Sequence, residues 1–203
     1  MNELDKIYSE KMAIRDFSKS YIEYVCSILE KISSDDIGQF VESLLSARDR
    51  ESTVYFIGNG GSAATASHFA NDIAIGTRSL DKPFRVISLC DNQAVITAIA
   101  NDDGYENIFS RQLGVLLKKD DVVVAISASG NSKNLLTAID TAKQKGATTI
   151  GLTAFDGGKL KEMVDISVHV PTNKGEYGPA EDGHIVLDHL VGSYLMRFVK
   201  DQG

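Results

Sequence analysis

A histidine and an aspartate stand four positions apart, at His68 and Asp72, in the stretch GSAATASHFANDIA. If this small-residue stretch is helical, the spacing places both side chains on one face of the helix. An imidazole and a carboxylate held together can transfer protons or bind a divalent metal ion. By itself such a pair is more often a surface or capping pair, so other residues must decide its role.

Two turns rich in glycine and hydroxyl groups follow short apolar runs. The first is GNGGS, residues 58–62, and the second is SASGNS, residues 127–132. Each offers backbone N–H groups and the positive end of the helix that it opens, which suits an anion such as phosphate. Glycine and serine are also ordinary turn residues, but two such turns at equivalent positions favour phosphate binding. The stretches lack GxGxxG, and Lys133 has the wrong spacing for the lysine of a nucleoside-triphosphate loop.

The composition is that of an ordinary globular domain. The 203 residues are 43% hydrophobic and 24% charged, which allows one domain with a sizeable core. The net charge of −7 argues against direct binding of nucleic acid, whose phosphates select basic surfaces. No apolar run reaches the ~20 residues of a membrane span, the N-terminal stretch lacks the apolar segment of a signal peptide, and two cysteines cannot form a disulfide framework. We therefore expect a cytoplasmic protein with no membrane partner.

Five short β-branched runs alternate with helical segments in the rest of the chain. The runs cover residues 53–58, 84–89, 121–127, 148–153 and 165–170, and the helical segments lie near 62–74, 92–117, 132–145, 158–163 and 180–200. Strands that alternate with helices predict an α/β fold with a five-stranded parallel sheet and helices on both faces. In such sheets ligands bind where the carboxyl ends of strands meet helix starts, and both turns lie at such positions.

Before residue 50 the apolar residues follow a helical period. They recur at steps of three, four and seven from Ile7 to Ile32, and a second helix follows with Ser34 or Asp35 as its N-cap. We divide the chain into an N-terminal helical extension, residues 1–50, and a sheet domain, residues 51–203. Because paired helices joined by short turns often build bundles, we expect the extension to join subunits, although it could instead cover the domain.

Four stretches of the sequence are similar to those of a known family: GNGGSAATASHF, TAIANDDGYENIFSRQL, AISASGNSKNLLTAI and GLTAFDGGKL. In order and spacing, from about residue 56 to the C-terminus, the chain resembles the sugar isomerase (SIS) domain proteins and, among them, the phosphoheptose isomerases. The resemblance implies a three-layer SIS fold, a homotetramer, and conversion of sedoheptulose 7-phosphate to D-glycero-D-manno-heptose 7-phosphate for cell-surface (lipopolysaccharide) heptose. Such an isomerase moves a proton through an enediol, so it needs a base, an acid and stabilisation of negative charge.

The resemblance also implies roles for particular residues. Asp72 is the base, and His189 in GPAEDGHIVLDHL is its acid–base partner. Zinc in some family members implies His68, Asp72, Glu181 and His189 as ligands, and two imidazoles with two carboxylates suit zinc or a neighbouring divalent metal. The serines of the two turns would hold the phosphate, and short polar side chains would bind the sugar hydroxyls. The substrate-binding positions are Asn59, Gly60, Gly61, Ser62, Asn101, Asp102, Ser127, Ala128, Ser129, Ser132 and Glu181.

Three departures from the family pattern keep a second class of function open. Asp72 replaces a glutamate, Glu181 replaces a glutamine, and Gly178 replaces an aspartate. In the alternative the chain is a non-catalytic phosphosugar-binding protein, either a regulator or an assembly factor that binds the replication initiator. Retention of both His68 and His189 beside carboxylates favours the enzyme.

The remaining charged residues of the C-terminal stretch are undecided by sequence alone. Asp182 and Asp188 could be solvated helix charges or first-turn carboxylates favoured by the helix dipole. His184 could be a neighbour of the site or an ordinary helix residue. We expect His169, which ends a strand, to be structural.

Overall fold

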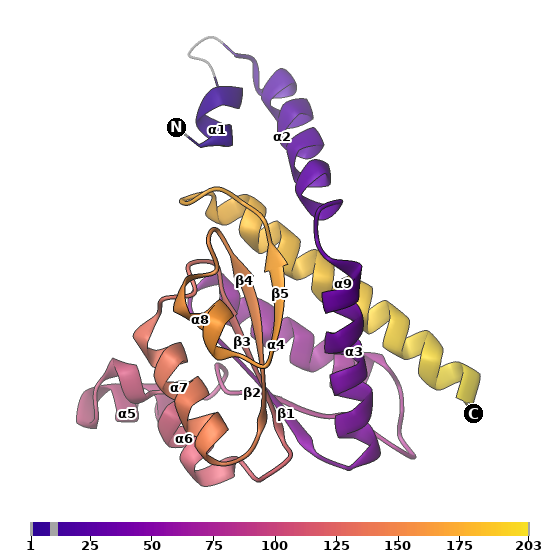
Figure 1. The fold of residues 1–203 in the computed structure, drawn as a ribbon, viewed down its shortest axis with the longest axis vertical. Helices are drawn as coiled ribbons and strands as arrows, with labels where there is room; N and C mark the ends of the chain where they lie inside the picture. The colour runs from indigo at the N-terminus through magenta and orange to yellow at the C-terminus, as the bar shows by residue number, and fades with distance from the viewer. Residues whose placement is uncertain (1, 9–11, 203) are drawn as a thin grey trace.

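A computed structural model describes residues 2–8 and 12–202 and arranges them around one parallel sheet (Figure 1). The five strands follow the order β2-β1-β3-β4-β5. They are β1 (Thr53–Gly58), β2 (Arg85–Ser88), β3 (Val122–Ser127), β4 (Thr148–Ala154) and β5 (Ile166–Val170). The predicted five-stranded parallel sheet is confirmed, and each strand end lies within one residue of its predicted position.

Helices cover both faces of the sheet and complete three layers (Figure 1). One face carries α3 (Ser34–Asp49), α4 (Gly61–Asn71) and α9 (Tyr177–Gln202), and the other carries α5 (Gln93–Asp102), α6 (Ser110–Leu116), α7 (Lys133–Gln144) and α8 (Gly158–Met163). Strand β3 is buried at every residue, because Val124 packs into one core and Val123 into the other. A strand covered on both faces requires an unbroken apolar run, which explains why the sequence there reads VVVAI.

The central pair of strands brings the two glycine-rich turns together. Strand β1 pairs in parallel with β3, and Gly58 lies opposite Ile126, the residue before Ser127. From this pair the chain continues to β2 on one side and to β4 and β5 on the other. The carboxyl ends of β1 and β3 therefore meet where the strand order reverses, which is where open α/β sheets bind ligands.

Several helix boundaries differ from those predicted. The segment expected at 92–117 is divided into α5, a 3₁₀ turn (Tyr105–Asn107) and α6, because Gly104 adopts a φ of 92° that no helix tolerates. Helix α4 ends at Asn71 and continues as a π-helical turn, Asp72–Gly76. The N-cap of α3 is Ser33 rather than Ser34 or Asp35, since its side chain accepts a hydrogen bond from the backbone N–H of Asp36 at 3.2 Å.

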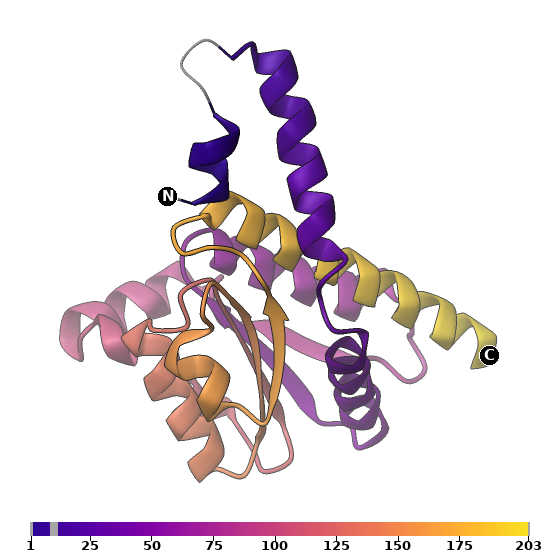
Figure 2. The same cartoon turned by 45° about the horizontal axis from the view of Figure 1, so that its top comes forward.

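The first helices extend away from the sheet. Helix α1 (Glu3–Ile7) lies above the start of α9 (Figure 2). Helix α2 (Ile14–Leu29) projects beside α1 and packs on α9. Helix α3 differs, because Phe40 and Leu44 are fully buried against the sheet. The division of the chain at residue 50 stays a prediction. Over residues 2–8 and 12–202, none of the helices combines the length and apolarity needed to cross a membrane.

A buried carboxylate fastens the N-terminal helices to the start of α9. Glu176 accepts hydrogen bonds from the backbone N–H of Glu3 at 2.5 Å, from the Tyr24 hydroxyl at 2.5 Å and from the backbone N–H of Asn173 at 3.0 Å. Burial by itself raises the pKa of Glu176, but the hydrogen bonds outweigh it and hold the pKa below its ordinary value. Because Glu176 precedes Tyr177, this network fixes where α9 begins.

We expect Glu176→Gln to lower the free energy of unfolding by about 1–3 kcal/mol, because an amide cannot accept all of these hydrogen bonds and leaves buried donors unpaired. Urea denaturation followed by circular dichroism measures the change. Glu162→Gln is the matched control, since Glu162 is exposed on α8. Equal stability of the two variants would contradict the anchoring role.

Candidate active site

A small polar cavity lies between the carboxyl ends of β1 and β3 and the start of α9. Its volume is about 160 Å³. Of the predicted substrate-binding residues, Asn59, Ser62, Ser127, Ala128, Ser129, Ser132 and Glu181 line it, together with Ile126, Leu135 and Tyr177. We call it the serine cavity. The structure therefore brings together most of the predicted phosphate-binding residues from two turns that are 69 positions apart (127 − 58).

Local geometry shapes both turns around this cavity. Gly60 has a φ of 55° and precedes the first residue of α4. A side chain at Gly58 would come within 2.5 Å of the carbonyl oxygen of Ser62, so only glycine lets α4 start so close to β1. In the second turn the Ser127 hydroxyl accepts the backbone N–H of Gly130 at 3.1 Å. A hydrogen bond of its own thus closes the second turn.

Sequence reasoning missed two side chains that contact Asn59 of the first turn, namely those of Asn134 and Tyr105. Asn59 and Asn134 exchange hydrogen bonds between their amide groups at 3.0 and 2.8 Å, and the Tyr105 hydroxyl donates to Asn59 Oδ1 at 2.9 Å. Asn134 is almost completely buried at the start of α7. Tyr105 lies in the stretch NDDGYEN and Asn134 in the stretch SGNSKN, but their contacts with Asn59 depend on the strand order.

Asn101 and Asp102 end helix α5 and do not line the serine cavity. The side chain of Asn101 donates to Asp102 Oδ1 at 2.7 Å, and both residues are exposed. The structure places them in the helix that precedes the Tyr105 turn. Their predicted contact with sugar hydroxyls stays a prediction.

Two histidines and two aspartates meet where α4 lies against α9. The His68 Nε2 atom is 3.6 Å from Asp72 Oδ2, and the His68 Nδ1 atom is 3.9 Å from Asp188 Oδ2. The rings of His68 and His189 are 5.1 Å apart, edge to face. One ligand atom from each of the four residues lies within 4.8 Å of the others. We call this group the histidine cluster.

The backbone explains how the two helices come so close. Asp72 is the first residue of the π-helical turn that follows α4, and such turns often mark functional sites. Opposite it on α9 stands Gly192, where an added Cβ atom would lie 3.5 Å from the Asp72 Cβ atom, an ordinary van der Waals contact. Asp72 therefore packs directly against α9.

Asp188 is the member of the cluster that sequence reasoning placed wrongly among helix-surface or first-turn charges. It is completely buried, and neither carboxylate oxygen has a hydrogen-bond partner among the described residues. Burial, and then the nearby Asp72 carboxylate, raise its pKa to about 7. A signal was present, because Asp188 lies on the same helical stripe as His184, Val191 and Leu195, which are all buried.

The structure does not bring Glu181 into this cluster. It precedes His189 by eight positions on α9, which corresponds to about 12 Å along a helix. Its carboxylate instead faces Gly61, where an added side chain would come within 2.5 Å of it, and it borders the serine cavity. Its place next to the substrate turns fits the predicted binding role, while its role as a metal ligand stays a prediction.

The histidine cluster is compatible with a divalent metal ion. Two imidazoles and two carboxylates are donors that zinc accepts, and the unpaired oxygens of buried Asp188 are acceptors that lack a partner among the described residues. A tetrahedral site needs donor atoms roughly 3.4 Å apart, so small side-chain movements would suffice.

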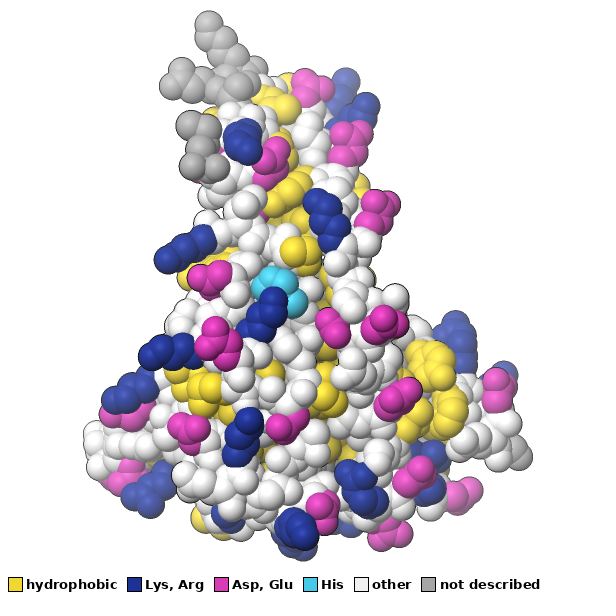
Figure 3. Space-filling view, in the orientation of Figure 1, with side chains coloured by type: hydrophobic (Ala, Val, Ile, Leu, Met, Phe, Trp, Pro, Cys, Tyr) yellow, Lys and Arg dark blue, Asp and Glu magenta, His cyan; other side chains and the backbone are white. Residues whose placement is uncertain are grey.

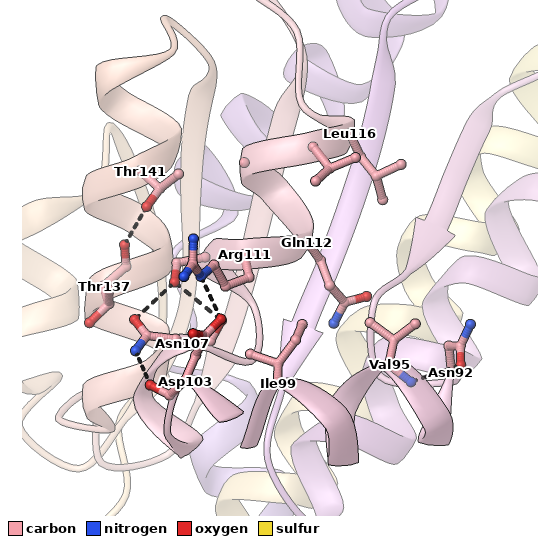
Figure 4. Close-up of a pocket in the computed structure, with 13 residues that line it drawn as sticks. Asn92, Val95, Ile99, Asp103, Asn107, Arg111, Gln112, Leu116, Thr137 and Thr141 are labelled. Carbon is pink, nitrogen blue, oxygen red and sulfur yellow. Dashed lines mark hydrogen bonds and ion pairs between the residues drawn. The ribbon is translucent and has the colours of Figure 1, made fainter. Parts of the chain in front are cut away.

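A larger hollow lies elsewhere on the surface. It measures about 1200 Å³ and lies between α5, α6 and α7, with Ile99, Leu116 and Thr141 among its walls (Figure 4). Arg111 and Asp103 form an ion pair of 2.8 Å inside it. None of the predicted site residues lines this hollow, so it is not the candidate active site.

Comparison with known proteins agrees with this geometry. The profile of the SIS domain family matches residues 20–154. The phosphoheptose isomerase of Helicobacter pylori strain P12 is 35% identical over 193 residues, which is 95% of each chain. Among solved structures, the phosphoheptose isomerase of Neisseria gonorrhoeae superposes with a TM-score of 0.80 at 29% identity, over 90% of this chain and 98% of that one. That of Francisella tularensis gives 0.83 at 25% identity, over 92% and 100%.

His184 lies on the buried stripe of α9 outside the histidine cluster. The side chain is completely buried, and neither ring nitrogen has a hydrogen-bond partner among the described residues. Burial lowers its pKa to about 4, so the ring is neutral at neutral pH. We conclude that His184 is a core residue rather than a proton donor.

We expect the buried His184 ring to lower the free energy of unfolding at acidic pH. Between about pH 6.5 and about pH 4 the unfolded chain binds a proton on this ring and the folded protein does not, so the free energy of unfolding falls by up to roughly 3 kcal/mol as the pH is lowered. Asp188 acts in the opposite direction, because its raised pKa lets the folded state bind a proton first. Urea denaturation of wild type and His184→Leu at about pH 7.5 and about pH 5 isolates the His184 contribution. An unchanged pH dependence in the variant would contradict it.

Proposed function

We propose a specific reaction for this chain, which belongs to the phosphoheptose isomerase family of SIS-domain proteins. It is an aldose–ketose isomerase, and we assign as its reaction the conversion of sedoheptulose 7-phosphate to D-glycero-D-manno-heptose 7-phosphate. The spacing of two sites along α4 supports this assignment most. Ser62 in the first turn borders the serine cavity, and His68 and Asp72 follow about two and three helical turns later, about 9–15 Å away. An extended seven-carbon sugar phosphate can span such a distance.

The chain's own groups suffice for the proton transfers. Backbone N–H groups and hydroxyls of the serine cavity hold the phosphate, which leaves the carbonyl end of the sugar near the histidine cluster. The Asp72 carboxylate removes a proton from C1 while His189 protonates the oxygen on C2, and an enediol forms. Asp72 then returns the proton to C2, and His189 takes the proton from the oxygen on C1. The ketose becomes the aldose with no net gain or loss of protons.

We propose zinc as the metal of this site. A bound ion polarises the sugar carbonyl and stabilises the negative charge that develops on the sugar oxygens. His68, Asp72 and His189 would hold it, whereas Glu181, the fourth ligand predicted from the family pattern, lies at the serine cavity in this structure. A carboxylate has two oxygens, so Asp72 can bind the ion through one and move a proton with the other.

A non-catalytic role is not favoured. A regulator or an assembly factor for the replication initiator needs no pair of histidines beside carboxylates, whereas His68, Asp72 and His189 lie together here. The relatives reported above are named phosphoheptose isomerases, and the similarity covers 90% or more of this chain. We also propose a cytoplasmic location and no direct contact with nucleic acid, which rest on composition alone.

We expect wild-type protein to exchange the proton next to the carbonyl of sedoheptulose 7-phosphate with deuterated solvent, as followed by NMR. His189→Ala should reduce the exchange by about 10²–10⁴-fold, the usual contribution of a general acid or base. His169→Gln is the control, since His169 bonds Thr153 at a strand end, outside the histidine cluster. If the wild type shows no exchange with or without added zinc, either the substrate is another phosphosugar or the chain is a binding protein.

The same assay tests the metal. We expect protein purified without chelator to contain zinc, and treatment with EDTA to reduce the exchange until zinc is restored. Full activity after EDTA, in protein shown to be free of metal by mass spectrometry, would remove zinc from the mechanism and leave proton transfer by Asp72 and His189.

We further propose a homotetramer in which the N-terminal helices join subunits. Apolar side chains are exposed on α2, where Ile14 is 77% and Ile22 61% exposed, and on α9, where Leu190 is 45% and Tyr194 50% exposed. Figure 3 shows apolar side chains along the projecting helices, while acidic and basic groups alternate over the body of this face. Burying these residues between chains would remove apolar surface from water.

We expect Ile22→Glu to shift the protein from tetramers to smaller species, because a charge would be buried without a partner. Light scattering after size-exclusion chromatography measures the mass. Lys19→Glu is the control, since Lys19 lies on the same helix with its side chain 79% exposed. Identical masses for both variants and wild type would exclude α2 from the assembly.

A further inference from the structure

We propose that Asp188 is a positioning residue for His68. Its carboxylate accepts the Nδ1–H of His68 and thereby leaves the Nε2 atom free to face Asp72 and the metal or substrate. The proposal rests on the proposed function, because it gives a purpose to the orientation of His68. Nothing in the family resemblance assigns a role to Asp188.

The first observation is the unusual burial of Asp188. The residue is fully buried, and both carboxylate oxygens lack a hydrogen-bond donor among the described residues. None of the described lysines or arginines forms an ion pair with it. An unsatisfied buried acceptor is rare in folded proteins and costs about 1–3 kcal/mol. Such a group calls for a physical explanation, and a role in the site is one.

The second observation is the orientation of the His68 ring beside Asp188. The Nδ1 atom of His68 lies 3.9 Å from Asp188 Oδ2, while the Nε2 atom on the other side of the ring lies 3.6 Å from Asp72 Oδ2. Both contacts are longer than a hydrogen bond of about 2.9 Å. Asp188 is nonetheless the stronger acceptor, because its carboxylate is fully buried in a low dielectric whereas the Asp72 side chain is 28% exposed, and a small rotation of the His68 ring shortens the Asp188 contact.

The two carboxylates differ in what they can do. Asp72 has a side chain that is 28% exposed and can meet a ligand, whereas Asp188 is enclosed behind the His68 ring. A buried acceptor behind a histidine fixes which ring nitrogen carries the proton and points the other nitrogen forward. Asp188 therefore acts through His68 and does not itself touch the substrate.

The experiment determines the tautomer of His68 directly. Protein labelled with ¹⁵N at histidine is studied by NMR without metal or substrate, at a pH near 8.5 so that the Asp188 carboxyl group is ionised. The His68 signals are assigned with His68→Gln. We expect the Nδ1–H tautomer of His68 to predominate in the wild type. In Asp188→Asn it should no longer exceed the Nε2–H tautomer, because the amide can donate an N–H group to Nδ1. We expect zinc affinity, measured by calorimetry, to fall by about 10–100-fold in the same variant.

Asp182→Asn is the matched control, since Asp182 lies on the same helix and accepts the Tyr21 hydroxyl at 2.6 Å. It should leave both the tautomer and the zinc affinity unchanged. A wild-type His68 that carries its proton on Nε2 overturns the proposal even if Asp188→Asn does not fold. Loss of zinc with an unchanged tautomer also overturns it, because Asp188 would then be a direct ligand. These measurements use no sugar, so an inactive isomerase would leave their outcome interpretable.

Discussion

The parallel pairing of β1 with β3 is the constraint on which the site depends. It places the carboxyl ends of two strands side by side, although the turns that follow them are far apart in the chain. The serine cavity exists only because these turns are adjacent. Helix α4 starts from the first turn and carries His68 and Asp72 away from the cavity at a fixed rise per residue. One pairing therefore sets both the serine cavity and the direction in which His68 and Asp72 lie from it.

Helix α9 provides the second half of the arrangement. It borders the serine cavity through Tyr177 and Glu181 and reaches the histidine cluster with Asp188 and His189 two turns later. Its start is held by Glu176, which also binds the N-terminal helices. Contacts at the N-terminus thus bear on the position of His189 without touching the histidine cluster.

The buried ionisable groups of α9 show how stability and function are balanced. His184 is neutral in the core, while Asp188 is a buried carboxyl group without a donor among the described residues. Their pKa values are displaced in opposite directions by the same cause, the loss of water around the charged form. A core without these groups would be more stable. The placement of Asp188 beside His68 gives the destabilising group a use, in agreement with the general tendency of functional sites to be locally strained.

The sequence by itself determined the features that depend on neighbouring residues. Strand runs such as VVVAIS, the glycine turns, and the i, i+4 pairing of His68 with Asp72 follow from local periodicity and backbone sterics, and all are present in the structure. Only the tertiary structure decided which residues meet from different elements. Asn134 and Tyr105 reach Asn59, Glu181 lies at the serine cavity, and Asp188 lies behind His68 because of strand order and helix packing. A polar residue on an apolar helix stripe has the same local sequence signature whether it is paired, unpaired or catalytic. What separates these cases is the dielectric and the partner groups supplied by distant parts of the chain.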